Sequence, residues 1–328
     1  MRRRLGCCAA LFAAAVAAVG AQSTSRPLVV CHAGSLSAAL ADVEKAFTAA
    51  HPDVRVSDVS GGSVALARKL ATGIQACDVY ASADYLVIDR MLKPAGLADY
   101  TVVFAEGRMV LAYLTTDPAA QGVSEANWYQ RLLAPGVRVG GAHPFLDPGG
   151  YRAHMILELA QRHYGVAGLY NSLLEHYQVI PAAGGPGAPA LGKDFSFQFT
   201  YEHSAAATAL GNPTYRYIRL SDRIDLSNPA HAADYARASV TLPGLGVTGA
   251  AASVTIPGAR VAWGVTVVKT STRQQDALAF VGMMLGPAGT TALNAHGPSP
   301  VAPVVDRGDY ARIPPPLQVL VKPGLTAP

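Results

Sequence analysis

The sequence predicts an α/β protein with two lobes around a ligand cleft. Short apolar strand patterns alternate with amphipathic helical patterns, which is typical of a parallel sheet with right-handed crossovers. The pattern leaves this first unit near Arg108 and returns to it near Arg260, so one lobe is built from two separate segments. The chain has 328 residues, of which 50% are hydrophobic and 15% are charged, and is long enough for two such lobes. Clefts between lobes commonly bind small ligands.

The first lobe begins with three strand patterns, each followed by a helical pattern. The strands are Leu28–Cys31, Val54–Val59 and Val79–Ala81, and the helices are Ser37–Ala50, Val64–Thr72 and Asp84–Met91. A Gly-Ser turn follows each of the first two strands. Because ligands of parallel sheets bind at the carboxyl ends of the strands, we expect these two turns to face one site.

The second lobe follows, and the chain then returns to the first. The expected elements are strands Met109–Tyr113, Val137–Gly140, Phe195–Thr200 and Tyr215–Leu220, helix Tyr151–Tyr164, the return strand Arg260–Val268, and helices Ala277–Leu285 and Ala288–Asn294. We therefore divide the chain into a leader (1–21), lobe 1 (22–107 plus 262–328) and lobe 2 (108–261). The Gly-, Pro- and Ala-rich stretch 182–192 reads as a loop, and we expect the Pro-rich tail from Pro298 to wrap the surface or be disordered.

The first residues have the form of a secretory signal. Arg2, Arg3 and Arg4 precede an apolar run and a small-residue exit near Ala21, so the mature chain should begin near Gln22. A lipidation box at Leu5-Gly6-Cys7 is the alternative, but no apolar run precedes that cysteine. Without the three arginines, 23 basic residues stand against 22 acidic ones, a formal charge of +1 that does not support a nucleic-acid partner.

Two cysteines, Cys31 and Cys77, remain after removal of the leader. They lie at neighbouring strand patterns and could pair in an oxidising compartment, but the sequence does not give their separation. Two buried free thiols are the favoured interpretation. The two cysteines lack the ligand spacing of a zinc site, and the nine histidines form no metal-binding cluster.

The two Gly-Ser turns, around Ser35 and Ser63, indicate binding of a small oxoanion. A helix that begins at such a turn offers unpaired N–H groups and a partial positive charge, and a serine adds a neutral donor. Both serines could instead be simple helix caps, although the two roles are compatible and the joint pattern favours contact with an anion. A nucleophilic serine of a secreted hydrolase has less support, because neither turn completes a G-x-S-x-G elbow.

Several runs along the chain together resemble one family. They are His32-Ala33-Gly34-Ser35-Leu36-Ser37, Gly62-Ser63-Val64 with Arg68-Lys69, Asp78-Val79-Tyr80-Ala81-Ser82-Ala83-Asp84-Tyr85, Met109-Val110-Leu111-Ala112-Tyr113, Asn127-Trp128-Tyr129, Asp147-Pro148-Gly149-Gly150-Tyr151-Arg152, Ile224-Asp225-Leu226-Ser227 and Trp263-Gly264-Val265-Thr266-Val267. In order and spacing they are similar to the extracytoplasmic tungstate/molybdate-binding proteins of ABC importers. The resemblance implies the type II periplasmic-binding-protein fold, with two α/β lobes joined by a two-strand hinge.

The resemblance also implies a set of ligand contacts. Ser35 and Ser63 would donate hydroxyl hydrogen bonds to the oxoanion, and Ala83 would approach it through its backbone. Asp147 and Glu202 would bind the tungsten or molybdenum of the bound oxoanion and make it six-coordinate, since a hard, high-valent metal accepts oxygen ligands. Asp147 before a proline is also an ordinary helix start, and Glu202 matches the family only with a one-residue gap.

The function implied is capture of tungstate and/or molybdate in the periplasm or another extracytoplasmic space. The partners would be the oxoanion and an ABC permease with its cytoplasmic ATPase, and we expect a monomer with no cofactor and no enzymatic activity. A protein for sulfate, phosphate or another small anion is the alternative on the same scaffold. Arg152 could bind the anion or counter Asp147, although its place in a first helical turn favours a surface position.

Overall fold

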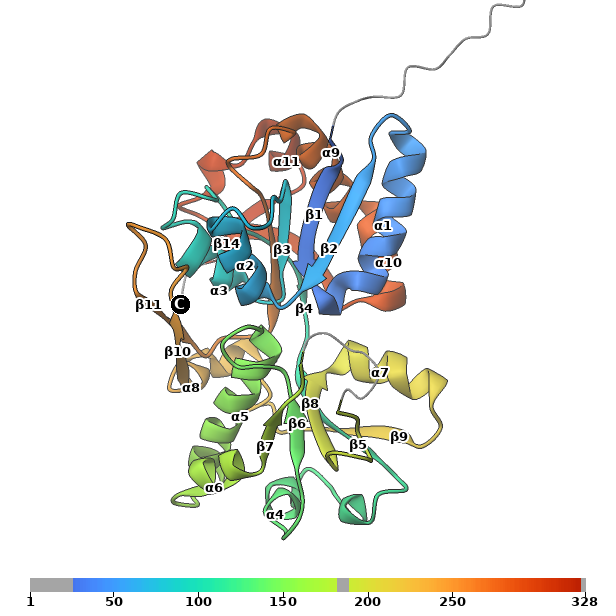
Figure 1. The fold of residues 1–328 in the computed structure, drawn as a ribbon, viewed down its shortest axis with the longest axis vertical. Helices are drawn as coiled ribbons and strands as arrows, with labels where there is room; N and C mark the ends of the chain where they lie inside the picture. Colours follow the sequence, from blue (N-terminus) through green and yellow to red (C-terminus); the bar gives the residue numbers. More distant parts are fainter. Residues whose placement is uncertain (1–25, 182–188, 326–328) are drawn as a thin grey trace, which may run out of the picture.

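The computed structural model describes residues 26–181 and 189–325, which form two α/β lobes lying one above the other (Figure 1). A seven-stranded sheet in the upper lobe has the order β14-β13-β4-β12-β3-β1-β2, and a five-stranded sheet in the lower lobe has the order β7-β6-β8-β5-β9. Strands β10 and β11 form a separate two-stranded ribbon. The expected fold class, with two lobes, is confirmed.

The upper sheet mixes parallel and antiparallel strands. It contains β1 (Leu28–Ala33), β2 (Val56–Gly61), β3 (Val79–Ser82), β4 (Val102–Glu106), β12 (Ala262–Val267), β13 (Ser299–Asp306) and β14 (Lys322–Leu325). The parallel trio β2-β1-β3 agrees with the sequence prediction, whereas β12 runs antiparallel to both β3 and β4. Every residue of β12 is buried, as expected for a central strand covered on both faces.

Helices pack on both faces of this sheet. They are α1 (Ser37–Ala50), α2 (Ser63–Ala71), α3 (Tyr85–Val87) continuing into a π-helical turn (Ile88–Leu92), α9 (Gln274–Leu285), α10 (Pro287–His296) and α11 (Pro315–Gln318). The buried stripe of α1 meets α9 through Phe47 and Phe280, whose ring centroids are 5.2 Å apart. The prediction for the tail from Pro298 is wrong: it supplies β13 and β14, because β4 leaves an edge that β13 covers.

The lower lobe is built around β5, which leads directly from the upper one. Its strands are β5 (Met109–Leu114), β6 (Val139–Gly141), β7 (Tyr177–Val179), β8 (Phe197–Tyr201) and β9 (Tyr215–Arg219), with β10 (Ser239–Pro243) and β11 (Ser253–Pro257) in the ribbon. Its helices are α4 (Trp128–Leu132), α5 (Pro148–Tyr164), α6 (Leu169–Glu175), α7 (Glu202–Gly211) and α8 (Ala232–Tyr235). Short 3₁₀ turns occur at Gly34–Leu36, Pro118–Ala120, Pro229–His231 and Tyr310–Arg312.

The chain passes between the lobes twice, near Arg108 and near Arg260, and these two segments are hydrogen-bonded to each other. The N–H of Gly107 donates to the carbonyl of Val261 at 3.0 Å, and the N–H of Met109 donates to that of Asp225 at 3.2 Å. Arg108 forms an ion pair with Asp225 at 3.3 Å beside them. The division into 22–107 plus 262–328 and 108–261 remains our proposal; it assigns all strands of the upper sheet to one lobe and all the others to the second.

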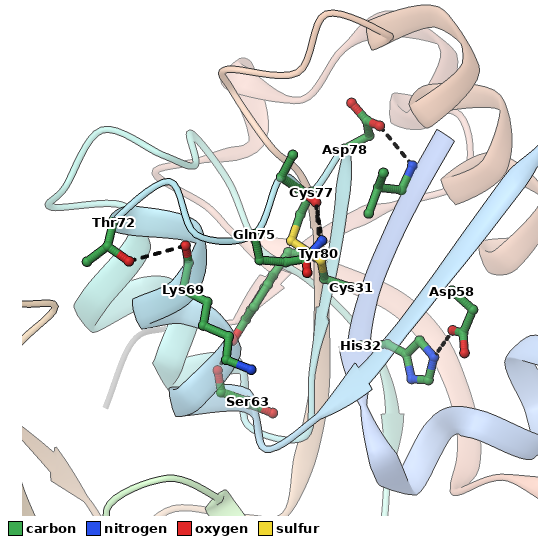
Figure 2. Close-up of a disulfide and its surroundings, with 12 residues drawn as sticks. Cys31, His32, Asp58, Ser63, Lys69, Thr72, Gln75, Cys77, Asp78 and Tyr80 are labelled. Carbon is green, nitrogen blue, oxygen red and sulfur yellow. Dashed lines mark hydrogen bonds and ion pairs between the residues drawn. A yellow bond between two sulfur atoms is a disulfide. The ribbon is translucent and has the colours of Figure 1, made fainter. Parts of the chain in front are cut away.

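Cys31 and Cys77 form a disulfide, so the favoured interpretation of two free thiols is wrong (Figure 2). Their Cα atoms are 5.7 Å apart although 46 positions separate them in the sequence. The physical reason is strand order: β1 and β3 are hydrogen-bonded neighbours, and Cys77 lies just before β3. The bond ties together two strands that lead into the candidate site.

Two sequence predictions fall wholly or partly outside the described residues. The secretory leader lies within residues 1–25, and most of the loop expected at 182–192 lies within 182–188. Across residues 26–181 and 189–325, no single helix is long and apolar enough to cross a membrane; only the bent pair α9 and α10 reaches that length and composition together.

Candidate functional site

A cavity of about 800 Å³ lies between the two lobes. The upper lobe contributes the turns after β1, β2 and β3, with Gly34, Ser35, Ser60, Gly62 and Ala83 among the lining residues. The lower lobe contributes Asp147, Phe199, Tyr201 and Ser204. The two Gly-Ser turns therefore meet at one edge of the sheet, as their positions in the sequence predict.

Ser35 presents its hydroxyl in a defined orientation. Its Oγ accepts a hydrogen bond from the indole Nε1 of Trp263 at 3.0 Å, and its carbonyl accepts one from Nε2 of His203 at 3.0 Å. An indole N–H can only donate, so this bond uses a lone pair of the hydroxyl and leaves the hydroxyl proton for another acceptor. An oxoanion in the cavity supplies such an acceptor. No local sequence pattern points to His203 or to the bond from Trp263 as part of this site.

Replacing Ser35 by alanine should weaken oxoanion binding. It removes one hydroxyl donor to a charged acceptor, a loss of about 1.5–3 kcal/mol, or roughly tenfold to a hundredfold in Kd. Titration calorimetry with tungstate measures the change. Ser37→Ala is the matched control, because Ser37 is exposed on the same turn and bonds Ser60 rather than the Trp263 indole. Equal affinities of Ser35→Ala and the wild type would contradict this role of Ser35.

Ser63 lies behind the cavity wall. Its side chain is buried, and its Oγ accepts a hydrogen bond from the N–H of Ala83 at 3.0 Å. The hydroxyl of Tyr80 donates to the carbonyl of Ser63 at 2.5 Å; Figure 2 shows the two residues together. Ala83 lines the cavity, but its N–H is engaged by Ser63. The pair thus fixes the end of β3, and direct contact of either residue with an anion stays a prediction.

Asp147 lines the cavity and also caps a helix. Its Oδ1 accepts a hydrogen bond from the N–H of Gly149 at 2.7 Å at the start of α5, so the helix-cap interpretation is confirmed. Burial raises the pKa of Asp147, while the Gly149 N–H and the charge of Arg152 act in the opposite direction. The other oxygen, Oδ2, is turned toward Gly62 of the upper lobe. A carboxylate so placed can reach an occupant of the cavity, and its role as a ligand stays a prediction.

Glu202 is not among the residues that line the cavity. Its carboxylate forms ion pairs with Arg108 at 3.3 Å and with Arg219 at 2.5 Å. Tyr201 and Ser204 line the cavity instead. Since α7 begins at Glu202, successive side chains there are turned by about 100° from one another, and only some of them face the site. Ser35, Ala83 and Asp147 therefore line the cavity, whereas the Glu202 carboxylate lies outside the lining and is paired with two arginines.

Arg152 is buried, with 2% of its surface exposed, so the expectation of a surface position is wrong. Its Nη1 donates to the carbonyl of Ala83 at 2.6 Å and to the hydroxyl of Tyr201 at 2.9 Å. Its Nη2 lies 3.3 Å from the carboxylate of Asp84, which also accepts a hydrogen bond from Tyr151 at 2.6 Å. The first turn of α5 is therefore enclosed between the lobes, which a helical pattern alone does not reveal.

Comparison with known proteins agrees with this arrangement. Residues 28–298 match the family model of bacterial extracellular solute-binding proteins. The chain belongs to this family. This solute-binding protein is 30% identical over 324 residues to a solute-binding protein of Methanoculleus marisnigri, with 90% of this chain and 86% of the relative covered. It is 28% identical to the molybdate/tungstate-binding protein WtpA of Thermococcus kodakarensis, with 80% of this chain and 78% of the relative covered.

Solved structures show the same two-lobed fold for this solute-binding protein. The sulfate-binding protein SubI of Mycobacterium tuberculosis superimposes with a TM-score of 0.60 at 17% identity, over 91% of this chain and 93% of the other. The periplasmic molybdate-binding protein of Azotobacter vinelandii gives a TM-score of 0.56 at 15% identity, over 84% and 98%. Both are type II periplasmic binding proteins, so the expected architecture is confirmed.

The lobes of this solute-binding protein are in contact across the cavity. The N–H of Ala65 in α2 donates to the carbonyl of Leu146 in the lower lobe at 3.1 Å. A Cβ added to Gly62 would lie only 2.5 Å from the same carbonyl oxygen. The Gly62-Ser63 turn therefore serves as the close-approach surface between the lobes as well as part of the cavity wall.

Proposed function

We propose that this solute-binding protein captures tungstate or molybdate outside the cytoplasm and delivers it, as a monomer, to an ABC permease driven by a cytoplasmic ATPase. The observation that carries the proposal is the Ser35 hydroxyl, held by the Trp263 indole so that its proton is left for an anion. The kinship with WtpA of Thermococcus kodakarensis supports the choice of oxoanion. The family description supports the extracytoplasmic location.

The charge of the cavity supports recognition by neutral donors. Among the described residues that line it there is no lysine or arginine, and Asp147 is the carboxylate. A carboxylate next to an anion repels it unless the two are joined by a bond. Tungsten and molybdenum in the hexavalent state accept oxygen ligands, whereas the sulfur of sulfate does not expand its coordination in this way. Coordination by Asp147 would therefore favour a metal oxoanion over sulfate.

The hydrogen bonds of the two serines do not favour a hydrolase. Ser35 Oγ is bonded to an indole, and Ser63 Oγ is bonded to a backbone N–H; neither group can accept a proton. His203, the histidine next to Ser35, bonds its carbonyl oxygen rather than its hydroxyl. Activation of a serine nucleophile needs a base on the hydroxyl. Binding without turnover is therefore the better-supported activity.

The size of the cavity favours a second candidate, a larger anion. A volume of about 800 Å³ lies in the range that holds an organic ligand of drug size. The part of the lining that the lower lobe contributes includes the apolar side chains of Val179, Ile180 and Phe199. An organic anion could place its charged group at Ser35 and its apolar part against this wall. Phenylphosphonate is a suitable probe for this candidate.

Titration calorimetry of the anion-stripped mature protein tests both candidates. Tungstate, molybdate, sulfate, phosphate and phenylphosphonate are titrated in parallel, and we expect tight one-to-one binding of the first two. Tight binding of phenylphosphonate alone would replace the proposed ligand by an organic anion. Tight binding of sulfate or phosphate, with no heat from tungstate or molybdate, would assign the protein to the simpler oxoanions.

Asp147→Asn should separate affinity from stability. Asparagine keeps the helix cap but cannot ionise, whereas burial raises the pKa of the Asp147 carboxyl group. At pH values above the folded pKa, ionised Asp147 lowers the free energy of unfolding of the ligand-free protein. This loss of stability shrinks as the pH falls and is gone below the pKa of an unperturbed Asp, about 4. We expect Asp147→Asn to melt higher than the wild type at pH 7, with a difference that closes as the pH falls.

The same variant should lose at least about tenfold in tungstate affinity, because it loses a charged ligand. Thermal melts of the ligand-free protein between pH 4 and 7, together with tungstate titrations, measure the two effects. Unchanged tungstate affinity would remove Asp147 from the set of ligands. An unchanged melting temperature at pH 7 would show that the carboxylate is well solvated.

A further inference from the structure

Arg68 bonds the lower lobe from outside the cavity. It lies on α2 in the upper lobe, beyond the Gly62-Ser63 turn, and it does not line the cavity. Its guanidinium donates to the carbonyls of Phe145 at 3.0 Å, Pro243 at 2.7 Å and Gly244 at 3.2 Å. Phe145 comes just before α5, and Pro243 and Gly244 stand at the end of β10 in the ribbon, which packs against α5 as well as against the π-helical turn of the upper lobe. The proposed division of the chain places all three acceptors in the lower lobe.

The geometry of these bonds requires an arginine. Nε, Nη1 and Nη2 each serve a different carbonyl, so the planar fork spans two separate loops. A lysine ammonium is a point donor on a flexible stem and cannot hold three acceptors in this arrangement. Among the ion pairs of the described residues none involves Arg68, and burial without a carboxylate partner lowers the pKa of the guanidinium. The guanidinium therefore bonds backbone carbonyls of the other lobe instead of a carboxylate.

The loops that accept these bonds are themselves held in place. The N–H of Gly244 donates to the carbonyl of Ala252 at 2.9 Å, and a Cβ on Gly244 would lie 1.8 Å from the carbonyl oxygen of Ala251. On the other side, the N–H of Phe145 donates to Nδ1 of His143 at 3.1 Å. Both loops thus present carbonyls at fixed positions, while Leu146, next to Phe145, receives the N–H of Ala65.

We propose that Arg68 is a latch that holds the two lobes closed and slows release of the bound anion without touching it. The proposal rests on the proposed function, since it assigns a positioning role around the same cavity. Opening of the lobes separates α2 from the Phe145 loop and breaks that bond, and it breaks the two bonds to Pro243 and Gly244 as the ribbon follows α5. The latch therefore acts on the closed state and on the dissociation rate, and much less on the first encounter with the anion.

Arg68→Gln and Lys69→Gln form a matched pair for the test. Both remove one positive charge from α2, but Lys69 is exposed and makes none of the three bonds to the lower lobe. Tungstate is the probe, and stopped-flow measurements follow association and dissociation through tryptophan fluorescence, to which Trp263 beside Ser35 contributes. Small-angle scattering gives the radius of gyration with and without tungstate. Melting temperatures confirm that each variant is folded, and Arg68→Lys provides a milder change.

We expect Arg68→Gln to raise the dissociation rate about tenfold or more, with Arg68→Lys in between and Lys69→Gln close to the wild type. The association rate should change by less than about threefold in all variants. Equal dissociation rates for Arg68→Gln and Lys69→Gln would overturn the latch. If the wild type binds no tungstate, the proposed function fails. The latch is then tested by the radius of gyration of the ligand-free variants, measured by small-angle scattering. A larger radius for Arg68→Gln than for Lys69→Gln would support it, and equal radii would overturn it.

Discussion

Gly62→Ala should reduce tungstate affinity more than about a hundredfold while leaving each lobe folded. An alanine Cβ at this position would lie 2.5 Å from the carbonyl oxygen of Leu146 and 3.1 Å from Oδ2 of Asp147, both in the lower lobe. The first contact is with backbone, which cannot yield as a flexible side chain does. Overpacking of this kind costs about 3 kcal/mol in the closed state, and this sets the expected loss in affinity.

Gly61→Ala is the control for this prediction. The three atoms nearest to its Cβ would all belong to the flexible side chain of Leu66 in the same lobe, the closest at 3.3 Å. Gly62 has φ −67° and ψ 131°, which alanine adopts readily, so the substitution introduces no backbone strain. Calorimetric titrations and melting temperatures of the two variants give the comparison. Wild-type affinity in Gly62→Ala would mean that the anion binds without the close approach of the lobes described above.

The sequence predicts the part of the site that depends on local pattern. A strand followed by glycine and serine at the start of a helix indicates donors at the carboxyl edge of a sheet, and Ser35 and Gly62 lie there. Asp147 before a proline similarly predicts a helix cap, and the structure contains it. In each case residues adjacent in the sequence determine the geometry, so no long-range contact has to be known in advance.

Features that depend on tertiary contacts could not be predicted in this way. The Cys31–Cys77 bond requires the order of β1 and β3, and the bond between Trp263 and Ser35 joins positions 228 apart. Strand β13 has a proline-rich sequence that suggests an irregular tail, yet it joins the upper sheet between β4 and β14 because pairing with β4 covers the edge of that strand. A local sequence pattern indicates the secondary structure that a segment prefers. A tertiary contact with residues elsewhere in the chain can override that preference, and the pattern does not contain it.

The role of Tyr201 illustrates the same limit at the site. Its hydroxyl accepts a hydrogen bond from Arg152, and its ring packs edge-on against Trp263 with centroids 4.9 Å apart. Burial raises the pKa of Tyr201 well above its usual value, so the phenol stays neutral. The family resemblance predicts a ligand at the next position, Glu202. In the structure α7 begins at Glu202, and Tyr201 rather than Glu202 lines the cavity.

Arg152→Met should destabilise the protein by about 3–5 kcal/mol, the largest stability effect we expect. The change leaves Asp84 buried without its cationic partner and removes the donor to the carbonyl of Ala83. Breaking a buried ion pair from one side is strongly destabilising because the remaining charge cannot be solvated. Urea denaturation measures the loss. Arg162→Met on the same helix is the control, since Arg162 is 49% exposed in its pair with Glu158 and should contribute within about 0.5 kcal/mol.

The double variant Asp84→Asn with Arg152→Met distinguishes the ion pair from simple loss of packing. Asparagine can still cap α3, where Oδ1 of Asp84 now accepts the N–H of Leu86 at 3.0 Å, so the local helix is preserved. If the unpaired charge is the main cost, adding Asp84→Asn recovers about 1–3 kcal/mol of the loss. A double variant as unstable as the sum of the single ones would instead assign the loss to the hydrogen bonds with Ala83 and Tyr201. The bond to Ala83, just after β3, joins the lower lobe to the upper one, whereas the bond to Tyr201 lies within the lower lobe, so Arg152 would then act through one contact between the lobes and one inside its own lobe.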